Sequence, residues 1–174
     1  MKNTLLLFSL ILIQLSVFSQ TIDKSKSMVY FKIGNMGISN VKGTFSGFTG
    51  KVNFNPNQLE SAKIDVCIDA SSINTKNKKR DEHLRSEDFF EVVTYPTICF
   101  TSDKITKSGG KYIAQGKLTL HGVTKTIEIP LTFQDNKLTS FFTLDRFDYK
   151  IGEDTGTFMV GTEVEIAINC FLIP

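Results

Sequence analysis

The sequence predicts an all-β domain of eight antiparallel strands, with a short helical connector between the third and the fourth. Apolar and polar residues alternate with a period of two along most of the chain, and turn-forming residues separate the successive runs. One charged stretch, RDEHLRSEDFF at residues 80–90, interrupts the series. It is too long for a hairpin turn, and its aromatic end is too apolar for a solvated loop. We therefore expect it to form short helical turns over the edge or mouth of the sheet.

The first three strands are predicted by the alternation around residues 29–33, 43–54 and 62–69. Glycines in the second of these runs indicate bulges or bends, which a closing barrel needs. The sequence NPN at residues 55–57 predicts the turn into the third strand.

The connector, residues 77–90, follows the third strand. Asn77 and Ser86 are the predicted N-caps of its helical turns, and the acidic residues after Ser86 suit a first turn. Leu84, Phe89 and Phe90 are expected to anchor the connector on the sheet, while its charged residues stay in water.

The last five strands are predicted by alternating runs around residues 97–102, 112–120, 127–133, 138–144 and 164–168. Short turn sequences separate most of them, and a polar loop precedes the last strand. These are SGG at 108–110, HG at 121–122, DN at 135–136 and the loop at 150–157.

Eight strands that each present one apolar face either close into a barrel or stack as a sandwich. A closed barrel removes the sheet edges, and a barrel of about eight strands has an interior that holds one small ligand. The periodicity alone does not distinguish these two arrangements.

Residues 1–19 have the features of a secretory signal peptide. Lys2 supplies the positive start, residues 5–15 are almost wholly apolar, and Val17 and Ser19 suit a cleavage site before Gln20. We therefore expect export to the periplasm and a single domain at residues 20–174. An uncleaved anchor helix is the alternative, although the apolar run is short for a bilayer span.

The charge of the chain is close to balanced, with 20 Lys and Arg against 18 Asp and Glu. Such a balance gives no field that would gather nucleic acid or an anionic membrane by itself. We therefore expect no nucleic-acid partner.

Three cysteines in an exported chain leave at least one unpaired. Strand parity turns Cys67 and Cys99 away from the apolar face, so a disulfide between them requires neighbouring strands in the right register. The sequence leaves that question open. Cys170 has the parity of a buried apolar residue. No two cysteines or histidines have the spacing of metal ligands, so neither a metal nor a cofactor is predicted.

Several segments give the chain a resemblance to the YceI-like family. They are RDEHL at 80–84, DFF at 88–90, YPTICF at 95–100 and GKLTLHGVTK at 116–125, supported by GTF at 43–45 and LDR at 144–146. The resemblance implies a lipocalin-like barrel around an apolar tunnel, in a bacterial envelope protein that binds a polyisoprenoid chain. It favours the barrel over the sandwich.

One position departs from the pattern of that family. The family commonly has a His-Met-Gly-like sequence near the end of its first strand, where this chain has Asn35, Met36 and Gly37. Asparagine keeps a hydrogen-bonding group but does not titrate near neutral pH. The departure therefore argues against a role for charge or metal at this point.

The resemblance and the inward parity of the strands together assign a ligand-binding lining for the tunnel. The predicted lining residues are Phe31, Ile33, Asn35, Phe45, Ile64, Val66, Ile68, Leu84, Phe89, Phe90, Ile98, Phe100, Leu118, Leu120, Ile129, Leu131, Phe142, Leu144, Arg146, Val164, Ile166 and Ile168. For Arg146 we expect either a charge-assisted bond to a diphosphate or quinone head group, or an internal salt bridge. The candidate partners of that salt bridge are Asp81, Asp148 and Asp154.

The predicted function is non-catalytic binding, storage or transport of a long apolar ligand, such as an isoprenoid lipid, a quinone or a polyprenyl phosphate. The protein would act as a monomer or homodimer, with transient membrane contact. One alternative is an enzyme for a lipid-like substrate that uses His83 and Asp81 as acid and base. The other is a structural or interaction module with a solid core.

Overall fold

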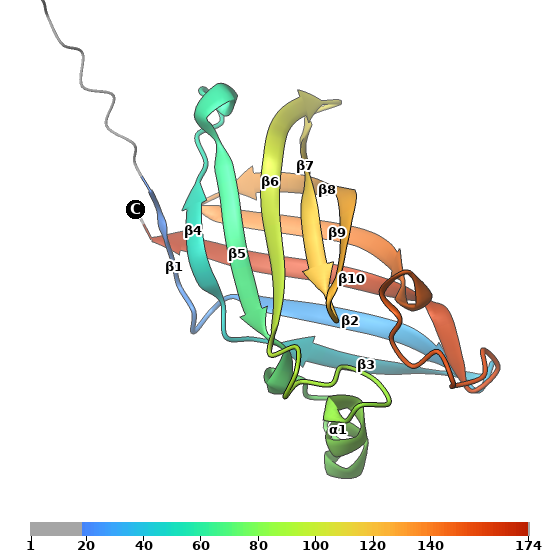
Figure 1. Cartoon of the computed structure of the whole chain (residues 1–174). Coiled ribbons are helices and arrows are strands. Elements are labelled where there is room, and N and C mark those ends of the chain that lie inside the picture. Colours follow the sequence, from blue (N-terminus) through green and yellow to red (C-terminus); the bar gives the residue numbers. More distant parts are fainter. Residues whose placement is uncertain (1–18, 174) are drawn as a thin grey trace, which may run out of the picture.

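The computed structural model describes residues 19–173, so the predicted signal peptide, except for its last residue, lies outside the described residues. Ten strands form one antiparallel sheet (Figure 1). Their bounds are β1 Thr21–Ile22, β2 Met28–Asn35, β3 Ser39–Phe45, β4 Thr49–Asn53, β5 Lys63–Asp69, β6 Thr97–Ser108, β7 Lys111–Leu120, β8 Val123–Gln134, β9 Lys137–Asp145 and β10 Val160–Ile173. The helical segments are η1 Leu59–Ser61, η2 Ala70–Ser72, α1 Lys78–Arg85 and η3 Arg146–Tyr149.

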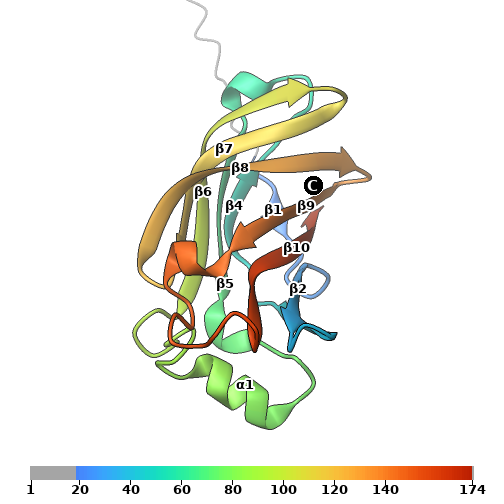
Figure 2. The same cartoon turned by 90° about the vertical axis from the view of Figure 1, so that its right-hand side faces the viewer.

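The sheet is strongly curled into a half-barrel. Its order is β3-β2-β10-β9-β8-β7-β6-β5-β4, with β1 paired to β10 beside this path. Figure 1 shows β4 to β7 crossing the direction of β2, β3, β9 and β10, and Figure 2 shows the same curl from the side. An all-β antiparallel fold with a helical connector, α1, between the third and fourth predicted strands is thus confirmed.

The predicted closure of eight strands into a barrel is wrong in two respects. The sheet has two edges, β3 and β4, which are not paired with each other. The predicted strand at residues 43–54 is two strands, because the chain bends at Ser46, Gly47 and Phe48. Gly47 has a φ of +74°, and a Cβ placed on it would lie 2.8 Å from the Cβ of Asp69, so only glycine fits this bend.

A short strand that the alternation did not reveal links β10 to the edge strand β4. β1 pairs with the end of β10, and Gln20 just before it forms a bridge with Val52 of β4. The backbone N–H of Gln20 donates to the Val52 carbonyl at 2.7 Å. A run of two residues carries too little periodicity to be predicted.

The sheet also opens between β8 and β9. These strands pair only from Leu131 opposite Ser140 to Gln134 opposite Lys137. Pro130, the next residue of β8, has no N–H to continue the ladder, and the Ser140 hydroxyl donates to its carbonyl at 2.6 Å. Beyond this point β8 stays with β7 and β9 stays with β10.

The connector begins as predicted and ends differently. Asn77 caps α1, because its side chain accepts a hydrogen bond from the Arg80 N–H at 3.1 Å. Ser86 is the C-cap of this helix, and its hydroxyl donates to the His83 carbonyl at 2.8 Å. The N-cap prediction is therefore confirmed for Asn77 and wrong for Ser86.

Asp81 is buried at the base of α1, so the expectation that the charged residues of the connector stay in water is wrong for this residue. Its Oδ1 accepts from the N–H of Thr75 at 2.8 Å and from the Thr75 hydroxyl at 2.5 Å. Arg80 donates to the same threonine, and Arg85 donates to the carbonyls of Ser71 and Ile73. The arginines and the aspartate thus fix the connector through the preceding loop.

Cys67 and Cys99 form a disulfide. They face each other directly across β5 and β6, which meets the condition that the sequence had left open. The bond closes a loop that contains η2, α1 and the whole connector. Cys170 is a free, buried cysteine, as its parity predicts, and burial raises the pKa of its thiol to about 11.

A solid core fills one end of the half-barrel. Phe54 lies at its centre, with ring centroids 5.0 Å from both Tyr112 and Phe133. The buried residues around them come from strands at the β1 end, and include Ile22, Val52, Ile64, Ile105, Leu131, Leu138 and Leu172.

Candidate functional site

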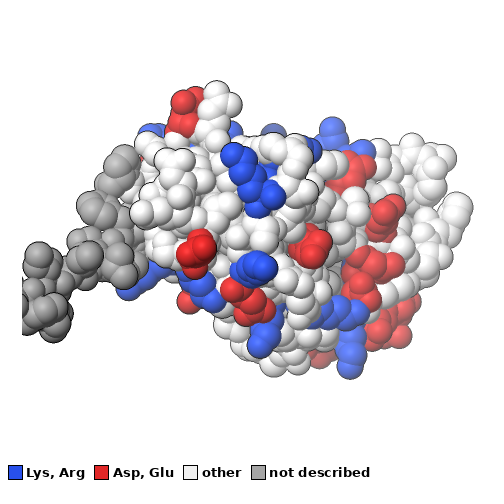
Figure 3. Space-filling view, turned by 90° about the horizontal axis from the view of Figure 1, so that it is seen from above, with Lys and Arg blue, Asp and Glu red and all other residues white. Residues whose placement is uncertain are grey.

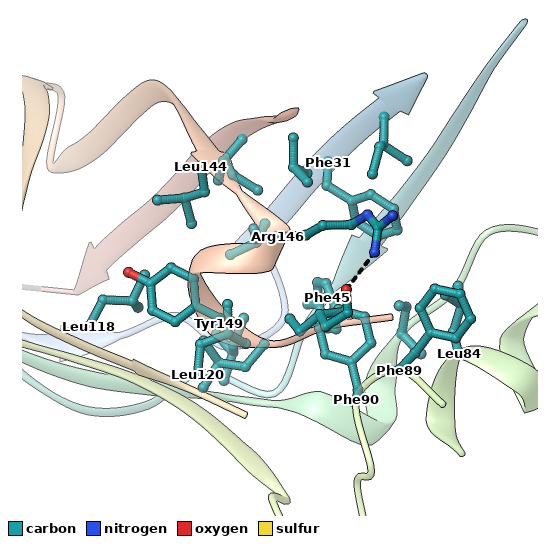
Figure 4. A pocket seen from close by; sticks show the side chains of 18 of the residues that line it. Phe31, Phe45, Leu84, Phe89, Phe90, Leu118, Leu120, Leu144, Arg146 and Tyr149 are labelled. Carbon is teal, nitrogen blue, oxygen red and sulfur yellow. Dashed lines mark hydrogen bonds between the residues drawn. The ribbon is translucent and has the colours of Figure 1, made fainter. Parts of the chain in front are cut away.

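The other end of the half-barrel encloses a cavity of about 410 Å³. One wall comes from β2, β3, β9 and β10, and the opposite wall from β5, β6 and β7. Nearly every side chain on these walls is apolar. Figure 4 shows Phe31, Phe45 and Phe90 near Arg146, with Leu118 and Leu120 at the other end of the view.

Strand β10 runs along the first wall from the mouth of the cavity to its deep end. Val164, Ile166 and Ile168 face the cavity in turn, from the mouth beside β2 and β3 toward the solid core. Each lies opposite one residue of β2 and one of β9. These pairs are Ile33 with Leu144, Phe31 with Phe142, and Val29 with Ser140.

The opposite wall follows from the same alternation. Phe100 on β6 pairs with Val66 on β5 and with Leu118 on β7, and all three line the cavity. Ile68 and Ile98 form the next pair toward the connector. Period-two parity in neighbouring strands therefore builds a continuous apolar surface.

The structure brings nearly all of the predicted lining residues to this cavity. The exceptions are Ile64 and Leu131, which point inward but lie in the solid core, where they are 6% and 7% exposed. They do not border the cavity, because parity gives the face of a strand and not the depth at which the interior becomes filled.

Arg146 differs from both expectations. It is 4% exposed, and its guanidinium donates to the backbone carbonyls of five residues. These are Gly161 at 2.9 Å, Ile151 at 2.6 Å, Thr155 at 2.9 Å, Val160 at 3.2 Å, and Gly152. No aspartate forms a salt bridge with it within residues 19–173.

The five bonds use the full donor capacity of the guanidinium. Arg146 therefore holds the loop between β9 and β10 in place, and any bond to a ligand head group would displace one of these carbonyls. Desolvation lowers its pKa, with an opposing contribution from the charge of Asp145.

Several cavity residues escaped the sequence prediction. Tyr149 comes from η3, and Ile151 comes from the following loop, residues 150–157, which the sequence predicts to be polar. Phe48 and Ile73 come from the bends beside β4 and α1. The apolar alternation of Phe147, Tyr149 and Ile151 is the signal that could have identified the first two residues.

Tyr149 is 1% exposed, and its hydroxyl has no hydrogen-bond partner among residues 19–173. Burial, with a smaller contribution from Asp148, raises its pKa to about 12. The phenol is therefore neutral at physiological pH and keeps an unused donor beside the cavity.

The connector covers one side of the cavity mouth, as expected. Phe90 packs edge-on against Phe45 with centroids 5.3 Å apart, and Phe89 packs edge-on against His83 at 5.1 Å. Leu84 also borders the cavity. Gly152 approaches Phe89 so closely that a Cβ there would lie 2.7 Å from the ring.

His83 and Asp81, the acid and base of the enzyme alternative, do not form a common site. His83 borders the mouth of the cavity, but its Nε2 lies 2.9 Å from Asp88 Oδ2, and both side chains are exposed to water. Asp81 is bonded to Thr75 and does not border the cavity. The proposed acid and base therefore do not converge on a common substrate position.

The second histidine is structural. The Nδ1–H of His121 donates to the Tyr149 carbonyl at 3.1 Å, which ties the turn between β7 and β8 to η3. Its Nε2 is 3.8 Å from Glu91 Oε2. Within residues 19–173 there is no group of three potential metal ligands, and no helix of that range is long and apolar enough to cross a membrane.

Sequence comparison relates this chain to a known protein family. The model of the YceI-like domain family matches residues 20–172. Protein YceI of Escherichia coli O157:H7 is 38% identical over 110 residues, which are 62% of this chain and 58% of that protein. The alignment thus spans little more than half the length of this curated relative.

Solved structures show the same fold. BcnA of Burkholderia cenocepacia matches with a TM-score of 0.77 and 26% identity, covering 86% of this chain and 98% of the other. A polyisoprenoid-binding domain from Saccharophagus degradans matches with a TM-score of 0.68, covering 88% and 97% of the two chains. At 18% identity, this second likeness is one of fold.

Proposed function

We propose that this chain, which belongs to the YceI-like domain family, binds and carries a long apolar molecule of the isoprenoid class and catalyses no reaction. The observation that supports this most is the cavity. It is enclosed by almost wholly apolar walls from both halves of the sheet, and it opens beside the connector.

The energetics of such a site suit a chain-like ligand. Each buried methylene gains about 0.8 kcal/mol, so affinity accumulates with chain length and needs few polar contacts. A cavity of about 410 Å³ also counts against a module with a solid core, because cores at native packing density leave few voids larger than a water molecule.

The polar end of the ligand would lie near the mouth. The polar side chains that border the cavity are Asn35, Arg80, His83, Asp145 and Thr155, while Arg146 is already bonded to carbonyls. Arg80 and His83 are the two of these that suit an anionic or polar head group. A quinone or a polyprenyl phosphate fits this arrangement, with its head group in water or against these side chains and its tail inside.

The test is native mass spectrometry of protein purified from a bacterial lysate that contains membranes. A copurified lipid, or uptake of an added polyprenyl phosphate or quinone by delipidated protein, is the expected result. A protein that stays empty under both conditions would refute the proposal. Ile166→Trp, which places a large ring in the cavity, is the matched variant expected to lose uptake.

We also propose that the chain is exported to the periplasm after cleavage before Gln20, as the features of residues 1–19 predict. The N-terminal sequence of protein recovered from the periplasmic fraction tests this directly. Recovery of the full-length chain in the cytoplasm would contradict it.

A further inference from the structure

Four large apolar side chains protrude at the cavity mouth. Met36 and Ile38 lie in the turn between β2 and β3, and Phe158 and Met159 lie just before β10. Their exposed fractions are 44%, 92%, 74% and 46%. We call these four residues the mouth tips. Buried apolar residues are expected in any fold, but a cluster exposed at one end indicates a contact surface.

The mouth tips belong to one protrusion, since the two segments are joined. The Met36 N–H donates to the Met159 carbonyl at 3.1 Å, and Asn35 lies opposite Val160 in the β2–β10 ladder. A Cβ built on Gly37 would lie 3.7 Å from the ring of Phe158, so this turn and this ring are in contact.

The protrusion carries no charge. Residues 33–41 and 155–162 contain no Lys, Arg, Asp or Glu. In Figure 3 the right-hand extremity, where β2, β3 and the segment before β10 meet, is white, and the charged patches nearest to it in that view are mainly acidic. These acidic patches would repel an anionic surface. The hydrocarbon region of a lipid bilayer, in contrast, would accept the apolar side chains of the protrusion.

The mouth tips are also continuous with the interior. Met159 is half exposed and borders the cavity, and its neighbours Asn35 and Val160 border it as well. An apolar path thus leads from the outer surface into the cavity. An apolar ligand that leaves the hydrocarbon interior of a membrane at this point would enter the protein with little exposure to water.

We propose that the mouth tips dock on the surface of a lipid bilayer by inserting into its interface. The inference rests on the proposed function and specifies where the apolar ligand is exchanged. A protein partner alone would not explain why this surface is continuous with a cavity that takes an apolar chain, whereas a bilayer is a source of such a chain. Insertion of a few exposed apolar residues gives reversible binding that depends little on salt.

The chain contains no tryptophan, so a single one reports its own environment. Phe158→Trp should show a blue-shifted emission when phosphatidylcholine vesicles are added, and quenching by lipids brominated in their acyl chains. Phe141→Trp is the matched control, because Phe141 is 62% exposed on the outer face of β9. Its emission should not change. A Phe158→Trp emission that is unaffected by vesicles overturns the proposal.

Two further outcomes would also overturn it. A blue shift that grows with protein concentration in the absence of vesicles would assign the surface to a second copy of the chain. Vesicle binding that is abolished by moderate salt would assign it to electrostatic adsorption. Binding that persists at high salt supports insertion.

Loss of the apolar surface gives the complementary test. The double variant Ile38→Ser and Phe158→Ser should lower the vesicle partition coefficient by about tenfold or more, since each side chain loses its transfer free energy. Phe141→Ser should leave partition unchanged. An unchanged partition of the double variant contradicts the inference.

Separate measurements test the two proposals: ligand uptake tests the proposed function, and vesicle binding tests the docking surface. The double variant should still take up an isoprenoid from a detergent-free solution, because neither residue lies deep in the cavity. Uptake without vesicle binding by the unaltered protein would leave the proposed function standing and refute the docking surface. Vesicle binding without any uptake would do the reverse.

Discussion

Arg146 shows how a residue can occupy its predicted position and have a different role. Its inward parity was correctly predicted, but the sequence does not reveal that the loop after η3 and the start of β10 together present five carbonyls to it. A buried cation needs either an anion or several dipoles, and here the dipoles come from the backbone. The cation thereby stabilises the loop that ends in the mouth tips.

Arg146→Lys tests this role. Lysine keeps the charge but has three donors, so at least two carbonyls lose their partners. We expect the free energy of unfolding to fall by about 2 kcal/mol or more, measured by urea denaturation. Ligand affinity per folded molecule should change little. A variant as stable as the parent chain would show that the loop does not depend on this clamp.

Alkaline pH should destabilise the protein through Cys170 and Tyr149. Burial raises their pKa values from 9.0 to about 11 and from 10.0 to about 12. Both groups are protonated in either state below pH 9, so their contribution is complete there. Above pH 9 the unfolded thiol loses its proton while the folded thiol keeps it, so the unfolded state binds fewer protons and stability falls.

The expected loss is up to about 1.4 kcal/mol per pH unit for each group. It begins near pH 9 for Cys170, and Tyr149 adds to it between pH 10 and 12. Urea unfolding at a series of alkaline pH values measures it. Cys170→Val should abolish the lower part of this dependence, and Tyr149→Phe the upper part. Identical alkaline profiles for all three proteins would refute the assignment.

At the scale of the elements, the sequence predicts most strands and turns well. The turns at Asp135 and Asn136, and at His121 and Gly122, have positive φ at both residues, as two-residue hairpins with matching twist require. What the sequence could not show were the short strand β1, the division of one run into two strands at the bend of Ser46 to Phe48, and the opening at Pro130. Each depends on which strand lies next to which, information that periodicity does not contain.

The lining of the candidate site was predictable to a similar degree. Alternation identifies the cavity-facing side of β2, β6, β7, β9 and β10, because a one-residue error would turn apolar side chains into water. It could not separate the cavity from the solid core, nor find Tyr149 and Ile151, whose positions depend on the fold of the loop at η3.

The disulfide should stabilise the connector against opening. It joins cysteines 32 residues apart, and closing a loop of that size in the unfolded chain is worth about 3–4 kcal/mol in the chain-entropy model. We expect Cys67→Ala with Cys99→Ala to lower stability by this order, measured by thermal and urea unfolding. A reductant should have the same effect on the parent chain and none on the variant. An equally stable variant would show that the loop is already ordered without the bond.

The connector should also gate the cavity. Phe89→Ala with Phe90→Ala removes two aromatic rings that pack at the mouth, at a cost of roughly 3–5 kcal/mol for each buried ring. In a stabilised background, ligand release should be faster in stopped-flow measurements with a fluorescent isoprenoid. Val93→Ala, which alters a residue of the segment after the connector that is 94% exposed, is the control. Unchanged release from the folded double variant would make the connector a structural plug.

At the scale of the whole molecule, one curled sheet combines a solid end with a hollow end. β10 runs through both, since Val164, Ile166 and Ile168 face the cavity while Cys170 and Leu172 lie in the core. The solid end supplies the packing that stabilises the fold, so the hollow end can remain unfilled. An apolar chain that enters at the mouth tips would then lie along β10 toward the core.

This arrangement predicts that the depth of the cavity limits the length of the isoprenoid chain that can bind fully. Ile168 lies at the deep end of the cavity, so Ile168→Trp should shorten the longest isoprenoid that binds fully and leave shorter ones unaffected. Each methylene that can no longer enter costs about 0.8 kcal/mol. Val164→Trp, at the mouth, should instead slow uptake of every length. Ala167→Trp is the control, because Ala167 lies opposite the outward-facing Tyr30 and Phe141.

Titration of a series of isoprenols of increasing length measures the effect. For the parent chain, affinity should rise with length and level off when the cavity is full, and for Ile168→Trp the plateau should come at a shorter chain. The added ring fills empty space, so stability should not fall as it does when a packed core is overfilled. If the plateau stays at the same length in Ile168→Trp, the ligand does not lie along β10, and the direction of entry inferred from the mouth tips is wrong.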